Sequence, residues 1–196
     1  MLSLPYPVVL ASGSPRRFEL LGQIVPSFQI AQPNIDEAGL TSTDPWGTAL
    51  RLAEAKAREV SKKRPDAIVI AGDTVVTLKV GGSYHQLAKP IDEADARRML
   101  RMLSGTTHQV ITGVCIASPM GVETFCETTD VEFRELTDRE IVDYVKSGEP
   151  MDKAGGYAIQ GGAAVFVKNI TGSHSNVVGL PVKELRARLE LMSDPA

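Results

Sequence analysis

The sequence predicts a single α/β domain that takes in all 196 residues, 1–196. Segments with strand-like and helix-like spacing of apolar residues alternate along the chain, and no low-complexity tract, long linker or internal repeat divides them. Ala67–Ala71 is apolar throughout and has the length of a strand, which indicates a central strand buried on both faces. A chain of this length can bury one substantial core.

The N-terminal segment predicts a strand, a turn and then a helix. Val8–Ala11 is apolar, and the small residues of Ser12–Ser14 lead into a proline. The last serine of that turn suits an N-cap, the proline suits the first helical turn, and the free amide groups there attract anions. Arg16 and Arg17 add charged forks that match phosphate oxygens. We therefore expect an anion site; the alternative is a surface helix whose arginines contact only solvent.

The next segment predicts a short strand, a polar loop and a long helix. Phe28–Ile30 alternates like a strand, and Pro33–Ser42 is polar. Apolar residues recur at helical spacing from Pro45 onward, and the cationic run Lys62–Arg64 suits the end of that helix. The apolar strand that follows is expected to deliver Gly72–Thr74 to the sheet edge.

The rest of the chain predicts two hairpins, three further helices and one more strand. Glycines and a proline mark the hairpin turns, and a capping box and a proline mark two helix starts. These elements are, in order, Val75–Val80 with Ser83–Leu87, a helix over Glu93–Leu103, Val110–Ala117 with Val122–Val131, a helix behind Thr137–Glu140, a strand over Ala163–Ile170 and a helix from Pro181. We assign their apolar stripes to the core.

Composition excludes several classes of protein. The formal net charge of −3 argues against a nucleic-acid coat, which must neutralise many phosphates. Cys115 and Cys126 have no nearby Cys or His at metal-ligand spacing, so we expect buried, reduced thiols in a reducing compartment rather than a zinc site. No basic residue precedes the first apolar stretch, and Pro5 and Pro7 interrupt it, so we expect a cytoplasmic protein with no membrane partner.

Polar residues that interrupt this frame are the candidates for chemistry. Asp73 follows an apolar strand, and α/β sheets place ligand sites at the ends of such strands, although a turn or cap role is the alternative. Glu37, Lys56, Lys89 and Lys153 are each ambiguous alone, because most charged side chains only solvate a surface.

Histidine and serine are poor candidates for a base or a nucleophile. His85, His108 and His174 fall at predicted hairpin or strand positions. Ser12 and Ser14 have no neighbouring base in the sequence, so phosphate contact is the better interpretation for both.

Several spaced motifs together resemble one family, the Maf family of nucleoside triphosphate pyrophosphatases. A match of many motifs in one order, from about residue 8 to residue 185, is far more specific than any one of them. They are Ala11–Arg17, Asn34–Glu37, Ala71–Val75, Lys89–Pro90, Ser104–Gly105, Asp152–Gly161 and Val178–Pro181. Small departures are Ala88, where the family usually has Gly, and Gly13 and Gly72, where it commonly has a residue with a side chain.

The resemblance implies a fold and a partner. It implies a single twisted mixed sheet flanked by helices, like that of inosine triphosphate pyrophosphatases, with a cleft between two lobes. It also implies a homodimer, a small-molecule nucleoside triphosphate as substrate, and a divalent cation, Mg²⁺ or Mn²⁺.

The resemblance also implies roles for individual residues. Asp73 would be the proton acceptor, with Lys56 and Lys89 as catalytic cations, and Glu37 and Asp73 would hold the metal. The residues that would bind substrate are Ser12, Ser14, Arg16, Arg17, Thr74, Lys153 and Gln160.

Three of these positions imply a substrate branch. Arg16, Thr74 and Gln160 resemble the branch that prefers dTTP and UTP, whereas the branch that takes 7-methylguanosine triphosphate typically has Trp, Gln and Glu there. A Gln amide offers one donor and one acceptor, which match O4 and N3–H of uracil or thymine. The alternatives are the other branch, a nucleotide-sensing regulator linked to cell division that performs no turnover, and a nucleic-acid-binding module.

Overall fold

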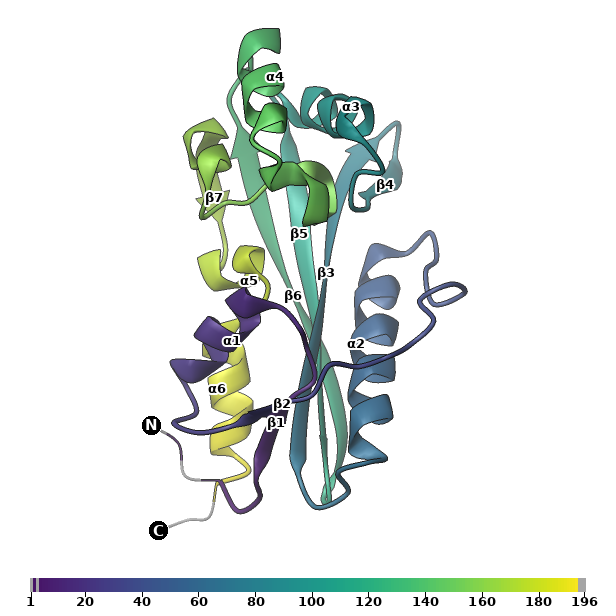
Figure 1. Ribbon diagram of the computed structural model, residues 1–196, viewed down its shortest axis with the longest axis vertical. Coiled ribbons are helices and arrows are strands. Elements are labelled where there is room, and N and C mark those ends of the chain that lie inside the picture. The colour runs from purple at the N-terminus through teal and green to yellow at the C-terminus, as the bar shows by residue number, and fades with distance from the viewer. Residues whose placement is uncertain (1, 3, 194–196) are drawn as a thin grey trace.

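The computed structural model describes residues 2 and 4–193, and within them a mixed sheet of seven strands runs along the molecule (Figure 1). The strand order is β2-β1-β3-β5-β6-β7, and β4 pairs with the far part of β3. β1 is parallel to β2 and β3, while the other pairs are antiparallel. The strands are β1 Val8–Leu10, β2 Gln29–Ile30, β3 Ile68–Val80, β4 Ser83–Leu87, β5 Thr107–Ser118, β6 Gly121–Phe133 and β7 Val167–Thr171.

Helices cover both faces of this sheet. In Figure 1, α2 lies along one side of the long strands, α1 and α6 lie on the other side, and α3 and α4 lie at the opposite end of the molecule. None of the helices within residues 2 and 4–193 is long and apolar enough to cross a membrane. The helices are α1 Pro15–Gly22, α2 Pro45–Ser61, α3 Glu93–Leu103, α4 Asp138–Lys146, α5 His174–Val178 and α6 Val182–Glu190, with short 3₁₀ helices at Glu149–Asp152, Ala154–Gly156 and Gly162–Phe166.

The helix starts follow from local capping. Ser14 caps α1, Asp44 caps α2 with Pro45 in the first turn, and Thr137 and Glu140 form the expected capping box of α4. Each cap gives an acceptor to amide groups that have no partner inside the helix. The expected α/β class and mixed sheet are confirmed, and so are most element positions.

The prediction that Gly72–Thr74 lies at a strand end was wrong. β3 continues from Ile68 to Val80 without a break, and Gly72–Thr74 pairs with β5 residues Val114, Gly113 and Thr112. Polar residues can occupy the middle of a buried strand when their side chains find partners, and both Asp73 and Thr74 do so. Asp73 therefore lies in the middle of a rigid strand rather than in a loop.

Two further expectations were wrong. The first half of the expected strand Ala163–Ile170 forms the 3₁₀ helix Gly162–Phe166, because a turn from Gly161 to Ala164 starts there, and only the second half joins β7. His174 begins α5 rather than lying in a strand, because the Ser173 side chain caps that helix. His85 and His108 lie on β4 and β5, as expected.

The two faces of β3 pack against different partners. Ile68 and Ile70 belong to the larger core, which also takes apolar residues of α1, α3, α4 and α6. On the other face, small residues pack Val69 and Ala71 against α2. Because successive side chains of a strand point to opposite faces, Asp73 faces α2 and Thr74 faces α1 and α5.

Candidate active site

A cavity of about 920 Å³ opens beside the middle of β3, between the end of the molecule that carries α1 and α2 and the end that carries α3 and α4. Its walls come from the β1–α1 turn, α2, β3, the segment after β4, the 3₁₀ segment and α5. The expected cleft between two lobes is therefore present. Every candidate site residue lines this cavity: Ser12, Ser14, Arg16, Arg17, Glu37, Lys56, Asp73, Thr74, Lys89, Lys153 and Gln160.

The β1–α1 turn forms one wall of the cavity. The Ser14 side chain accepts a hydrogen bond from the Arg17 amide at 3.4 Å, and the Ser14 amide donates to Ser12 Oγ at 3.1 Å. Two serine hydroxyls thus lie next to the amide groups that begin α1. Such a helix start presents partial positive charge to whatever enters the turn.

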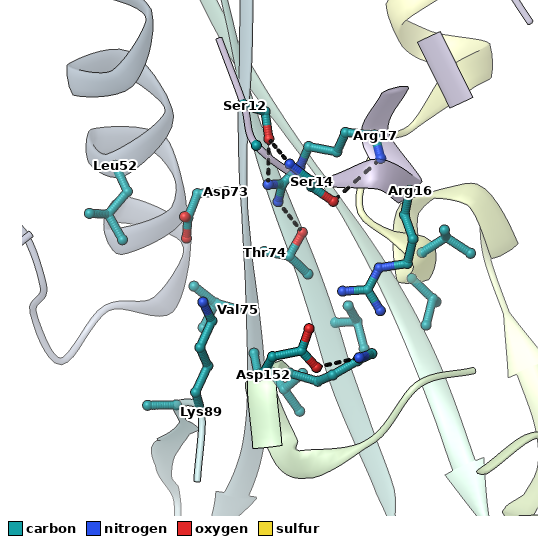
Figure 2. A pocket seen from close by; sticks show the side chains of 18 of the residues that line it. Ser12, Ser14, Arg16, Arg17, Leu52, Asp73, Thr74, Val75, Lys89 and Asp152 are labelled. Carbon is teal, nitrogen blue, oxygen red and sulfur yellow. Dashed lines mark hydrogen bonds and ion pairs between the residues drawn. The ribbon is translucent and has the colours of Figure 1, made fainter. Parts of the chain in front are cut away.

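The Arg17 guanidinium reaches from α1 to β3 and α5 (Figure 2). Its Nε donates to the Gly179 carbonyl at 2.8 Å, its Nη2 donates to Thr74 Oγ1 at 3.0 Å, and its Nη1 lies 3.5 Å from Ser12 Oγ. Burial lowers the pKa of Arg17, while the nearby negative charge of Asp73 raises it. The Nη1 edge, next to the serine turn, is the part of the fork best placed to meet an anion.

Lys56 joins two carboxylates on the other side of β3. Its Nζ lies 2.6 Å from Asp73 Oδ1 and 2.8 Å from Glu37 Oε1. The Lys56 and Asp73 side chains are each only 15% exposed, whereas that of Glu37 is 56% exposed. Burial reduces the screening of this charge pair by solvent, so the attraction between Lys56 and Asp73 is stronger than it would be in water.

The same arrangement fits a divalent cation. Glu37 and Asp73 direct oxygens at one positively charged atom, so both carboxylates can serve one cationic centre. Two carboxylates together with substrate phosphates are the donor set that Mg²⁺ prefers. Within residues 2 and 4–193 no group of three or more His, Cys, Asp or Glu could hold a metal by itself, so phosphate oxygens would have to complete the coordination.

A second group of charges lies at the rim formed by the 3₁₀ segment. The Lys153 ammonium contacts the Asp152 carboxylate, and this hydrogen bond lowers the pKa of Asp152. Figure 2 shows Arg16 pointing toward Asp152, and Lys89 pointing along β3 toward Asp73. Together with Lys56, these cations line the cavity from four parts of the chain: α1, α2, the segment after β4 and the 3₁₀ segment.

Glycine lets the 3₁₀ segment lie close to β3. Gly155 has φ of +72°, and a Cβ there would lie 2.8 Å from the Val76 side chain. The Gly155 amide also donates to the Ala88 carbonyl, which ties this segment to the residue before Lys89. No residue other than glycine has a positive φ in the described part of the chain, so Ala88 causes no strain where the family usually has glycine.

The cavity contains no histidine among the residues described. His108 does not line it but is buried against Tyr157, which does, and burial lowers the pKa of His108 to about 3. Cys115 is buried as expected, whereas Cys126 is only half-buried, and neither forms a disulfide in the described part of the chain.

Sequence reasoning missed the groups that hold Arg17. Gly179 contributes only a carbonyl, and Thr112 and Asn176 look like ordinary core residues in the sequence. Val177 and Val178 also line the cavity. The family motif Val178–Pro181, which includes Gly179, was the signal in the sequence that pointed to this wall of the cavity.

Comparison with known proteins identifies close relatives. A family model described as Maf-like protein matches residues 7–192. A dTTP/UTP pyrophosphatase of Deinococcus radiodurans is 50% identical over 175 residues, which cover 89% of this chain and 87% of that protein. A protein of the same name from Anaeromyxobacter dehalogenans is 50% identical over 192 residues, which cover 96% of this chain and 95% of that protein.

Solved structures share the fold at low sequence identity. The Ham1 protein of Staphylococcus aureus has a TM-score of 0.54 at 20% identity and covers 94% of this chain and 98% of its own. The HAM1 protein of Coxiella burnetii has a TM-score of 0.55 at 16% identity and covers 95% of this chain and 99% of its own. At these identities the likeness shows a shared fold alone.

Proposed function

The chain belongs to the family of Maf-like proteins, and from that premise we propose that it hydrolyses dTTP and UTP to the nucleoside monophosphate and pyrophosphate. The observation that carries the proposal is the contact of Lys56 with Asp73 inside a cavity whose opposite wall holds Arg17 and the start of α1. A carboxylate poised by a cation, facing an anion site, suits attack of water on a phosphoric anhydride.

The triphosphate would bind along the β1–α1 turn. Arg17 offers its Nη1 edge, Ser12 and Ser14 offer hydroxyls, and the amide groups of α1 offer partial positive charge. Arg16 and Lys153 add charge at the rim of the cavity. Fixed cations of this kind offset the negative oxygens that shield the α-phosphorus from attack.

Asp73 would accept the proton of the attacking water. Its carboxylate has a fixed direction, because it projects from the middle of β3 toward α2 and contacts Lys56 at 2.6 Å. A well-placed general base contributes about 10²- to 10⁴-fold to a rate. Lys56 and Lys89 would neutralise charge on the departing pyrophosphate. Because water attacks the phosphorus directly, no covalent intermediate is needed.

Glu37 and Asp73 are the residues that would hold Mg²⁺ or Mn²⁺. When bound, such an ion neutralises phosphate charge and polarises the phosphorus that water attacks. The convergence of both carboxylates on one ammonium supports this assignment.

Gln160 is our candidate for reading the base. It lines the same cavity as the β1–α1 turn, and its amide matches the donor and acceptor of uracil and thymine. Thr74, which we also assigned to substrate, donates and accepts within the protein, so we propose that it acts on the substrate through Arg17. The names of the curated relatives support dTTP and UTP over 7-methylguanosine triphosphate.

A homodimer and a cytoplasmic location are further proposals that rest on family resemblance. A nucleotide-sensing regulator is the second candidate function, because the same cations would bind a triphosphate without turnover. A panel of normal and modified triphosphates, assayed for pyrophosphate release with Mg²⁺, Mn²⁺ and no metal, separates these functions. We expect release that depends on metal and is fastest with dTTP or UTP. Binding without release of pyrophosphate would support the regulator instead.

A further inference from the structure

A chain of hydrogen bonds connects Arg17 to a region of the sheet that does not line the cavity. Arg17 Nη2 lies 3.0 Å from Thr74 Oγ1, which in turn lies 3.0 Å from Thr112 Oγ1. The Thr112 hydroxyl donates to the Asn176 carbonyl at 2.9 Å. The chain therefore crosses from α1 through β3 and β5 to α5.

The direction of each bond in this chain follows from the number of protons available. A threonine hydroxyl has one proton, and Thr112 gives its proton to the Asn176 carbonyl. Thr74 must therefore donate to Thr112, and it accepts from Arg17, which can only donate. All three bonds run the same way, from the guanidinium toward α5. Bonds aligned in this manner polarise and strengthen one another.

The far end of this chain is firmly held. Asn176 is fully buried, and its Nδ2 donates to the Val110 carbonyl at 3.0 Å and to Thr129 Oγ1 at 2.9 Å. These bonds attach α5 to β5 and β6. Gly179, directly after α5, supplies the carbonyl that accepts from Arg17 Nε. The Arg17 Nε bond therefore ends directly on the α5 segment, and the Arg17 Nη2 bond is connected to the same segment through Thr74 and Thr112.

We propose that Thr112 is a positioning residue for Arg17, and that it sets which edge of the guanidinium a triphosphate meets. With Nε and Nη2 engaged, the Nη1 edge remains toward Ser12 and the turn. Thr112 is fully buried and does not line the cavity, so its effect on the substrate passes through Thr74 and Arg17. This inference rests on the proposed function, since it concerns how the same site grips its triphosphate.

Thr112→Val tests the proposal because it removes the hydroxyl and keeps the branched shape. Without an acceptor at position 112, Thr74 can turn its proton elsewhere and Arg17 loses its fixed partner. We expect KM for dTTP and Kd for inorganic pyrophosphate, measured by calorimetry, both to rise about tenfold, since hydrogen bonds to charged groups have this weight. We expect kcat to change much less, because the lost interaction is formed in the bound ground state as well.

Three further variants make the test specific to Arg17. Thr112→Ser restores a hydroxyl and should restore KM. Thr77→Val is a matched control, because Thr77 is buried in the same sheet and its hydroxyl donates to the His85 carbonyl, away from the chain; its KM should stay at the wild-type value. In an Arg17→Met background, Thr112→Val should cause no further loss of pyrophosphate binding.

The outcomes separate this proposal from the proposed function. If the wild-type protein neither binds nor hydrolyses dTTP, the function is wrong. If it does both and Thr112→Val matches it in KM and Kd, or if Thr112→Val weakens binding equally in the Arg17→Met background, the positioning role is wrong. Should Thr112→Val fail to fold, Thr112→Cys replaces the hydroxyl with a weaker donor, and the same two results decide.

Discussion

Asp73 of β3 lies directly opposite Gly113 of β5 in the antiparallel ladder, and the backbone of α2 passes over that glycine. A Cβ at position 113 would lie 2.4 Å from the carbonyl carbon and oxygen of Ala49. Because α2 comes this close to the sheet, Lys56 reaches Asp73. The missing side chain of one glycine thus sets the distance between the cation and the carboxylate of the site.

Gly113→Ala should weaken both folding and activity. The added methyl group meets backbone atoms, which cannot rotate away, so α2 must move off the sheet. We expect a loss of about 1–3 kcal/mol in the free energy of unfolding, the usual cost of overpacking a core. Lys56 moves with the helix, so kcat for dTTP should fall as well. Urea unfolding and steady-state kinetics on the same preparation measure both effects.

Gly22→Ala is the matched control for this substitution. Gly22 ends α1, and a Cβ there meets no atom within 4 Å. Alanine is the better helix former, so stability should stay the same or rise slightly. Wild-type stability and kcat in Gly113→Ala would contradict the close packing of α2.

Lys56→Met should greatly lower kcat for dTTP. The variant leaves Asp73 and Glu37 together without their shared cation, and it removes a positive charge from the phosphate site. Losing one preorganised electrostatic group costs about 10²- to 10³-fold in kcat. Lys63→Met is the control, because Lys63 is exposed near the end of the same helix and pairs with Glu59. Equal kcat values for Lys56→Met and Lys63→Met would show that Lys56 has no catalytic role.

Gln160→Glu should change which base the enzyme prefers. A carboxylate only accepts hydrogen bonds, so it cannot donate to O4 of uracil, whereas it suits the two neighbouring donors of guanine. We expect the ratio of kcat/KM for UTP to that for GTP to fall by at least about tenfold. The comparison is internal to each protein, so a general loss of activity does not affect it. An unchanged ratio would show that another residue reads the base.

His108 should make the protein less stable as the pH falls. Burial lowers its pKa to about 3, whereas in the unfolded chain the ordinary value is about 6.5. Below pH 6.5 His108 is protonated in the unfolded chain but stays neutral in the folded protein. The free energy of unfolding is therefore highest above this pH and decreases as the pH falls toward 3. The slope should reach about 1.4 kcal/mol per pH unit.

The pH effect can be isolated with His108→Gln. Glutamine keeps a polar group near the Tyr157 hydroxyl but does not titrate. Urea unfolding of both proteins at pH 7.0, 6.0 and 5.0 should give a smaller loss of stability for the variant. Parallel lines for the two proteins would show that His108 takes up its proton in the folded state.

Local signals in the sequence predicted most of the fold. Ser14 and the box of Thr137 and Glu140 cap helices where expected, because capping depends on residues only three positions apart. The break expected at Gly72–Thr74 failed for the opposite reason. Whether a polar residue ends a strand depends on partners distant in sequence. Asp73 contacts Lys56 of α2, and local sequence signals predict that helix but not how it packs against β3.

The sequence indicates some of the charged residues of the site, but not the uncharged residues that hold them in position. Arg17 follows a turn of small residues and Asp73 follows an apolar run, so both stand out in the sequence. Lys56 is ambiguous alone and was assigned only through the family resemblance. Thr112 does not stand out, since a β-branched residue in a strand is ordinary. Its role follows from the register that places it beside Thr74, and register is a property of the folded sheet.

Hydrolysis of dTTP in ¹⁸O-labelled water, in the presence of Mg²⁺, tests the central claim most directly. Wild-type protein should give only pyrophosphate and dTMP, with the label in dTMP, because water attacks the α-phosphorus. Asp73→Asn should still bind dTTP and lose at least about 10²-fold in rate, as expected for removal of a general base. Label in the pyrophosphate, release of inorganic phosphate with dTDP, or full activity of Asp73→Asn would contradict the account.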